Sequence, residues 1–382
     1  MPLTDLPNEI IALLPQHIDN LETFTNASSS CRLLRENFSK TDPRTILRLA
    51  ANSAPVFFSP HPHFLTAITA RKASAWALGD ESRTERLREA FQGGIEGLYS
   101  FCLEHSSLSM EEIRRTHLAR FEIINVFSDR IDKMAGDQWM HTPNFWNGGV
   151  SSAYTLYTDA ERAAFQIIIY GELFAASMDA FLDPEQNLPW FDIGTRLDYC
   201  KYCIPDLSCD SYDAQNGSPG LEVHPTGPYS FRNNKKKKSP PKDLELDQVA
   251  MRHITGCGRW RRMWGSAIRE ILPKAEGEGQ EFTEQDEEEE HWRKKLLRRA
   301  LQTQGLEGMQ IITASPGSVS PEWVERTRRI KDQIDKLEKP PPTQRLGNWA
   351  QYLVFFAPDL TKEVRVTIAT YSGYGWDEDL VP

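Results

Sequence analysis

The sequence predicts a mainly α protein. Apolar residues recur at helical spacing wherever a periodicity can be read, and capping residues, prolines and glycines bracket these segments. No internal repeat of fixed length is found, which argues against repeat architectures. The chain has 382 residues, of which 40% are hydrophobic and 26% charged. This composition is typical of globular proteins and leaves room for one large or two medium domains.

The first predicted element is a short helix that ends at Pro15. Thr4 and Asp5 offer capping side chains just ahead of Pro7, and proline is well tolerated in the first turn of a helix. Pro15 lacks a backbone donor and disfavours helical backbone at the residue before it. We therefore expect a helix of about two turns that ends at Leu14.

Two more short helices are predicted directly afterwards. Asp19 and Glu22 have the spacing of a capping box and predict the start of the second helix. Three helices of this length bury too little surface to form a core alone, so the next helices or a partner must cover them. Their apolar positions are Leu21, Phe24 and Ala27 in the second helix and Cys31, Leu33 and Leu34 in the third.

The helical pattern continues beyond this unit. Thr41 and Asp42 precede Pro43 as a capping pair, which predicts a helix over 43–52. Around 138–154 aromatic residues lie among glycine, asparagine and proline, and we expect a connection packed by its own side chains. Further helices are predicted over 64–78, 84–105, 110–135 and 158–182.

The longest apolar tract, 163–182, predicts a core helix of a soluble domain. It contains Gln166, Glu172 and Asp179, which would be costly at the centre of a bilayer. A membrane-spanning role is therefore not expected.

The second half of the chain alternates between polar and helical segments. Residues 206–247 are rich in glycine, proline, serine and charge, and they predict a disordered loop. Helical pattern returns at 248–272 and 291–304, and β-branched alternation at 364–370 predicts a short strand. The predicted organisation is a three-helix unit over 1–48, a helical domain in two parts over 49–205 and 248–382, and the loop over 206–247 between those parts.

Charge and the start of the chain argue for an intracellular protein. The net charge of −10 provides no overall attraction to nucleic acid or to anionic membranes. The opening residues carry neither a basic segment nor a continuous apolar run, so a secretory signal is not expected. We expect a cytoplasmic or nuclear location, with the six cysteines present as thiols.

One cysteine cluster resembles half of a zinc site. Cys200 and Cys203 have the Cys-x-x-Cys spacing, and Cys209 follows six residues later. A second matching pair is missing, although His224 and Cys257 lie further along the chain. The favoured interpretation is a helix end with buried thiols and no cofactor, and a structural zinc site stays as an alternative.

A basic and aromatic region provides a second alternative, nucleic-acid binding. Four lysines at 235–238 could direct nuclear import or contact phosphates. Trp260 and Trp264 share a helix face, and arginines lie near them. Such a tryptophan pair is more often part of a core, and a lysine run more often aids solubility, so nucleic acid is the less favoured partner.

No catalytic constellation is recognised in the sequence. Phosphate-binding loops, His-Glu-x-x-His, Gly-x-Ser-x-Gly and dinucleotide fingerprints are absent. We therefore expect a protein that is not an enzyme.

The first 48 residues resemble the F-box. The resemblance is carried by Leu6-Pro7-Asn8-Glu9-Ile10, by the acidic start of the second helix from Asp19 to Leu21, and by Ser30-Cys31-Arg32-Leu33-Leu34. It covers roughly residues 3–48, and the whole chain resembles F-box proteins of filamentous fungi. Two positions depart from the usual pattern: Pro15 falls inside the first helix, and Glu36-Asn37-Phe38 replaces an aromatic late in the third.

The resemblance implies an adaptor in a ubiquitin ligase. An F-box docks on the linker subunit of a cullin-RING (SCF-type) ligase, while the rest of the chain recruits a protein substrate for ubiquitination. Because no repeats of known recognition type occur, the substrate is not predicted. The expected contact residues, some of which must instead hold the helices together, are Leu6, Pro7, Ile10, Ile11, Leu14, Ile18, Leu21, Phe24, Cys31 and Leu34.

Overall fold

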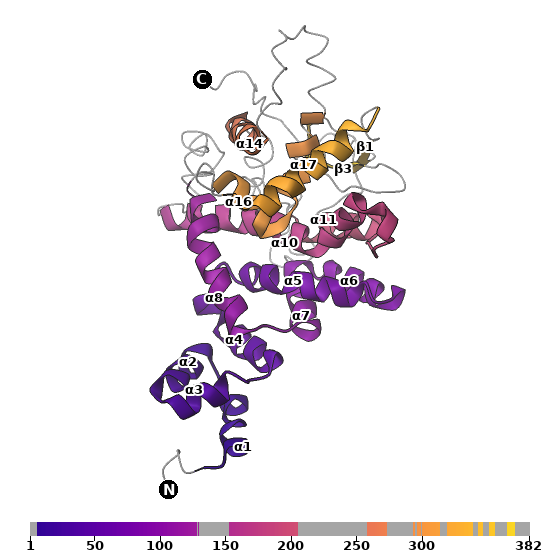
Figure 1. Cartoon of the computed structure of the whole chain (residues 1–382). Coiled ribbons are helices and arrows are strands. Elements are labelled where there is room, and N and C mark those ends of the chain that lie inside the picture. The colour runs from indigo at the N-terminus through magenta and orange to yellow at the C-terminus, as the bar shows by residue number, and fades with distance from the viewer. Residues whose placement is uncertain are drawn as a thin grey trace, which may run out of the picture.

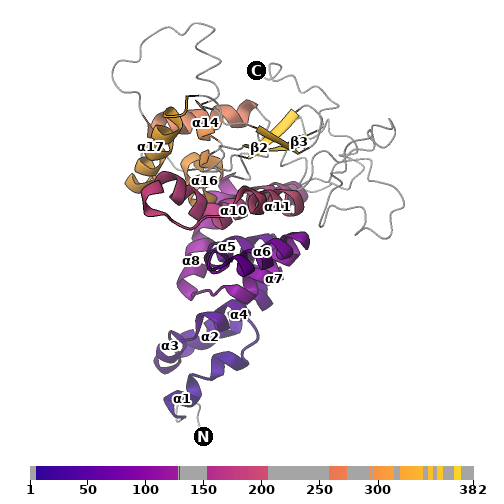
Figure 2. The ribbon, with the colours of Figure 1, turned by 90° about the vertical axis from the view of Figure 1, so that its right-hand side faces the viewer.

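The structure is a computed structural model, and it shows the mainly α protein that the sequence predicts (Figures 1 and 2). The N-terminal helices project from one end of the molecule, and the longest helix crosses the body above them. The described residues are 6–127, 129, 153–204, 258–272 and 293–338, without 295, 299 and 314–318, together with strands at 343–346, 351–355 and 365–370. The predicted loop over 206–247, the lysine run at 235–238, and all but the last two residues of the connection predicted over 138–154 lie outside these residues.

The first helix is shorter than predicted. It ends at Ile11, before Pro15 is reached, and Pro15 instead lies in the first turn of a following 3₁₀ helix, where it is buried. A proline suits that position because a first-turn residue needs no backbone donor. The opening elements are α1 (Asn8–Ile11), η2 (Leu14–His17), α2 (Leu21–Ser30) and α3 (Arg32–Phe38).

The cap of α2 also differs from the prediction. Asn20, not Asp19, is the N-cap, and its side-chain oxygen accepts a hydrogen bond of 2.8 Å from the Thr23 backbone N–H. Asn20 has the extended backbone that an N-cap requires. The neighbouring Asp19 provides its carbonyl oxygen to another helix instead.

Helix α4 (Pro43–Phe57) joins the N-terminal unit to the body. As predicted, Asp42 caps it, and the Asp42 carboxylate accepts a 2.8 Å hydrogen bond from the Arg44 backbone N–H. The helix continues five residues past its predicted end, so the predicted division after residue 48 falls within it. Its buried face carries Ile46, Leu49 and Ala50.

Four helices form the lower part of the body. The helix predicted over 84–105 is two helices, because the chain turns at Gly93 and Gly94, and Gly94 adopts a φ of 67° that favours glycine. The last helix begins with a capping box between Ser109 and Glu112 and continues into a π-helix, Arg120–Ile124. The four helices are α5 (His63–Ala77), α6 (Glu81–Gln92), α7 (Gly94–His105) and α8 (Met110–Ala119).

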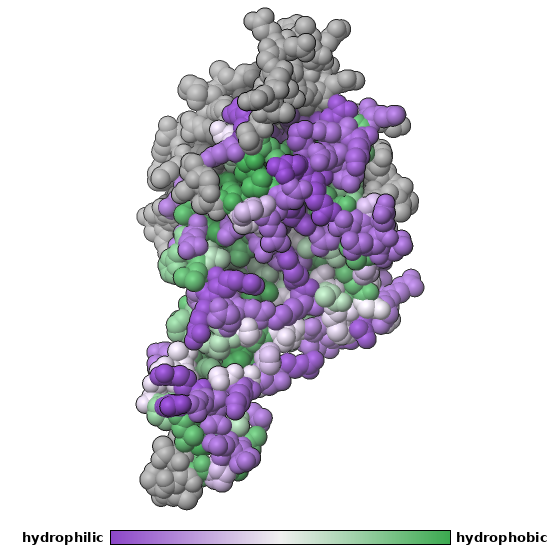
Figure 3. Space-filling view, in the orientation of Figure 1, coloured by the Kyte–Doolittle hydropathy of each residue, from purple (hydrophilic) through white to green (hydrophobic). Residues whose placement is uncertain are grey.

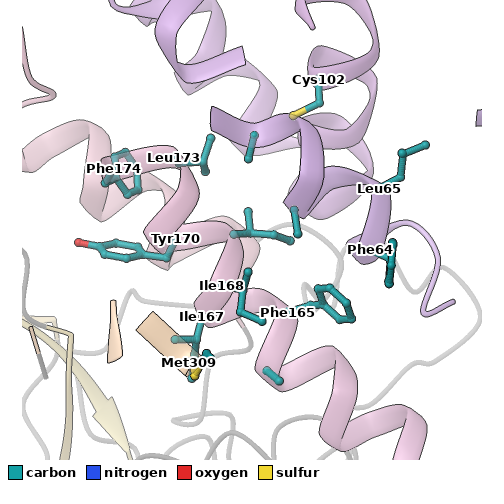
Figure 4. Packing of buried hydrophobic residues seen from close by; sticks show 14 of the residues in the cluster. Phe64, Leu65, Cys102, Phe165, Ile167, Ile168, Tyr170, Leu173, Phe174 and Met309 are labelled. Carbon is teal, nitrogen blue, oxygen red and sulfur yellow. The ribbon is translucent and has the colours of Figure 1, made fainter. Parts of the chain in front are cut away.

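Helix α10 (Ala153–Leu182) is the central core element. Figure 4 shows its side chains packed on α5 on one side, where Phe165 meets Phe64, and near Met309 on another. Its segment Glu161–Leu182 is long and apolar enough to cross a membrane, but 78% of that window is buried inside the protein. Burial of this kind is expected of a core helix.

Helices from the second half of the chain pack on α10. A close backbone contact joins α10 to α16, because a Cβ atom added to Gly171 would lie 2.0 Å from the Gly305 nitrogen. Further helices in this part of the chain are η4 (Pro184–Gln186), α11 (Ile193–Cys203), α14 (Gly258–Ile271), α16 (Gly305–Thr313) and α17 (Pro321–Asp335).

The C-terminal strands form a small sheet. Strand β3 (Arg365–Thr370) coincides with the strand predicted at 364–370 and lies between the other two. It pairs in parallel with β1 (Thr343–Leu346) and antiparallel with β2 (Gln351–Phe355).

Candidate partner-binding surface

The N-terminal unit has a small aromatic core. Phe24 and Phe38 stack with ring centroids 5.1 Å apart, and both side chains are buried. Ile11 and Leu34 are buried as well. Ile11, Phe24 and Leu34 were predicted as partner contacts, but they hold the helices of the unit together. Phe38, at the end of α3, completes this core.

Two large apolar side chains remain exposed at the start of the chain. Ile10 is 46% exposed and Leu13 is 47% exposed. Pro7, next to the start of α1, is exposed too. We call Pro7, Ile10 and Leu13 the tip patch. Leu13 was missing from the predicted contacts, although its position three residues after Ile10 was a readable signal.

The other predicted contact residues are neither fully buried nor fully exposed. Their side chains are partly buried and pack against the core. They are Leu6, Leu14, Ile18, Leu21 and Cys31.

Helix α4 holds the segment that follows the tip patch. The Arg48 guanidinium donates hydrogen bonds to the backbone carbonyl oxygens of Pro15, Gln16 and Ile18, at 3.1, 3.1 and 3.0 Å. These bonds join residues that lie far apart in the sequence, so the helical periodicity of the sequence does not predict them. Two neighbouring α4 residues add to the set: Asn52 donates to the Asp19 carbonyl oxygen at 2.9 Å, and Ser53 Oγ accepts from the Leu21 N–H at 2.9 Å.

The surface of α3 is polar. Arg32 and Glu36 form an exposed ion pair of 2.7 Å, which lowers the pKa of the Glu36 carboxyl through the hydrogen bond and charge of Arg32. Solvent and salt screen such a pair, so it contributes little to stability. Figure 3 shows polar and apolar residues side by side on this N-terminal unit.

The cysteines considered for metal binding and the tryptophans considered for nucleic-acid binding lie outside the N-terminal unit. Cys203 is buried at the end of α11, and its Sγ lies 3.9 Å from the Phe91 carbonyl oxygen. Cys200 lies one turn earlier in α11, whereas Cys209 lies outside the described residues, as do His224 and Cys257. Among the residues that the structure describes, no group of three or more His, Cys, Asp or Glu side chains could hold a metal ion. Trp264 is fully buried, so its ring is not available for base stacking.

Comparison with known proteins assigns the chain to no family. No protein-family model, no curated protein and no solved structure matches the chain.

Proposed function

We propose that the protein is an F-box-type adaptor, which docks on the linker subunit of a cullin-RING ubiquitin ligase and recruits a protein substrate for ubiquitination. The observation that supports this most directly is the exposure of Ile10 and Leu13 on the tip of a small helical unit. The F-box-like start of the sequence, Leu6 to Ile10, includes the first of these two residues. A partner that covers these side chains would remove apolar surface from water, which favours association.

The construction of the unit supports a docking role. Its core of Ile11, Phe24, Leu34 and Phe38 points inward, while the tip patch points away from it. Arg48 and its neighbours on α4 hold the backbone of residues 15–21, directly after the patch, which restricts the movement of this segment. A surface fixed before binding loses less conformational entropy when the partner docks.

The shape of the molecule is compatible with an adaptor. The N-terminal helices project at one end, and the body lies beyond α4 (Figures 1 and 2). A linker subunit at the tip would therefore leave the faces of the body open to a substrate.

Binding of the purified linker subunit to the full-length chain tests the proposal. Isothermal titration calorimetry is run on wild type, on Ile10→Ser/Leu13→Ser, and on Leu118→Ser/Phe121→Ser, a matched pair of exposed apolar residues on the body. We expect the tip variant to lose at least about tenfold in affinity and the body variant to match wild type. Absence of binding by wild type, or equal binding by both variants, would refute the proposal.

A further inference from the structure

Large apolar side chains are exposed at a second place, on the body. Leu118 is 62% exposed and Phe121 is 66% exposed, while Val56 and Phe57 are 77% and 42% exposed. Among the described residues, these four together with Ile10 and Leu13 are the large hydrophobic side chains left in solvent. We call Val56, Phe57, Leu118 and Phe121 the junction patch.

The two halves of the junction patch lie beside each other. The rings of Phe58, directly after α4, and His117, on α8, are 5.3 Å apart. Arg120 donates a hydrogen bond to the Ser59 carbonyl oxygen across the same contact. The C-terminal end of α4 therefore borders the end of α8, and each exposed pair lies within a few residues of this contact.

The backbone beneath Phe121 is unusual. Residues 120–124 form a π-helix, in which the Asn125 N–H donates to the Arg120 carbonyl oxygen. The Arg120 side chain lies inward, with its Nη2 atom 3.3 Å from Glu161 and its guanidinium 5.4 Å from the centre of the Phe64 ring. Phe121 is consequently exposed on a turn that is anchored to the core. Single π-helical turns are rare and occur frequently at functional sites.

Two arginines make the surface on one side of the junction patch basic. Arg114 and Arg115 precede Leu118 by four and three residues, so they share its side of the helix. Arg114 has only a 3.8 Å contact with Glu111, and both side chains are largely exposed. Arg115 makes no ion pair with any described residue, and the exposed acids on this stretch are Glu111 before the two arginines and Glu122 after Leu118. A segment that fits this surface combines apolar side chains with acidic ones that reach the two arginines.

We propose that the junction patch is the surface at which the protein captures its substrate, through a substrate segment that carries apolar side chains next to acidic ones. The inference rests on the proposed adaptor function, because an adaptor needs a second surface that the linker subunit leaves free. The patch meets this need, since α8 lies on the body while α1 lies at the far end of the N-terminal unit (Figures 1 and 2).

The test uses a display library of random peptides, selected on the immobilised full-length protein. We expect enriched peptides to combine aromatic or aliphatic residues with Asp and Glu. Synthetic copies should bind Leu118→Ser/Phe121→Ser at least about tenfold more weakly than wild type, and should bind Ile10→Ser/Leu13→Ser as well as wild type. Arg114→Glu/Arg115→Glu should weaken their binding as well, and the wild-type affinity should fall with added salt.

Three results would overturn the inference. The first is that no peptide is enriched, and the second is enrichment without acidic residues or without loss in the Leu118→Ser/Phe121→Ser variant. The third is a concentration-dependent dimer in sedimentation equilibrium that this variant abolishes, because the patch would then bind a second copy. Binding of the linker subunit without enriched peptides removes this inference alone, whereas enriched peptides without linker binding remove the adaptor function and leave a peptide-binding surface.

Discussion

The Arg48 guanidinium donates a 3.1 Å hydrogen bond to the carbonyl oxygen of Pro15, across 33 positions of sequence. Pro15 is itself buried, and it lies in the first turn of η2, directly after the exposed Leu13. A side chain from α4 therefore fixes the backbone next to the tip patch.

The first prediction concerns Arg48. Replacing it with methionine keeps most of its apolar stem but leaves three carbonyl oxygens without their donor. We expect the free energy of unfolding to fall by about 1.5 to 3 kcal/mol, since hydrogen bonds from charged groups are the stronger kind. Urea denaturation measures this change, and hydrogen exchange should become faster at residues 16–21. Arg32→Met is the control, because Arg32 is exposed and should leave both measurements unchanged.

The second prediction separates core from surface in the N-terminal unit. Phe38→Ala removes the ring that stacks on Phe24 and should cost about 3 to 5 kcal/mol, as buried phenylalanine truncations do. Linker binding and thermal stability should then be lost together. Ile10→Ser should reduce binding without lowering the unfolding temperature, since Ile10 is already half in solvent. Equal loss of stability in both variants would contradict the assignment of Ile10 to the surface.

The third prediction concerns the contact of α10 with α16. Gly171→Ala places a Cβ atom 2.0 Å from the Gly305 nitrogen, so two backbones must separate. Overpacking of this kind should destabilise the protein by about 1 to 3 kcal/mol or more. Gly265→Ala is the matched control, because no atom lies within 4 Å of the added Cβ in helix α14. That change should be neutral or stabilise by up to about 1 kcal/mol through helix propensity.

The fourth prediction is a loss of stability in acid that depends on His63. Burial lowers the pKa of His63 to about 3, with smaller contributions from the charges of Arg162 and His61. Neither ring nitrogen of His63 has a hydrogen-bond partner in the described part of the chain. Between pH 6.5 and about pH 3 the unfolded chain therefore binds a proton at His63 while the folded chain does not.

The stabilising effect of a neutral His63 is thus complete above pH 6.5 and decreases as the pH falls towards 3. The slope should approach about 1.4 kcal/mol per pH unit within that window. Urea denaturation at a series of pH values measures it, and His63→Leu should have a shallower slope. Burial also lowers the pKa values of His105 and His117, so part of the acid sensitivity should remain in this variant. Parallel curves for wild type and variant would show that His63 is not responsible.

Much of the helical framework could be predicted from local sequence. The 64–78 helix was placed within one residue of α5, and the cap of α4 at Asp42 and Pro43 was predicted from its residue types. Errors arose where two neighbouring residues had similar propensities. Asp19 and Asn20 can both cap a helix, and only the extended backbone of Asn20 decides between them.

The candidate surface was predictable only in part. The apolar stripe was evident from the first 37 residues, yet the stripe did not show which of its side chains stay in solvent. Ile10 and Ile11 are adjacent and chemically alike, but one is 46% exposed and the other is fully buried. The junction patch was not predicted, because its halves lie about sixty residues apart in sequence and meet through tertiary contacts such as that of Phe58 with His117.

The sequence by itself determined a mainly α chain and the start of α4 at Asp42 and Pro43, because caps, prolines and apolar spacing act over a few residues. The tertiary structure decided which apolar residues became core and which stayed in solvent. Burial depends on contacts between distant segments, such as Arg48 with Pro15 and Phe24 with Phe38, and local propensity does not encode those contacts.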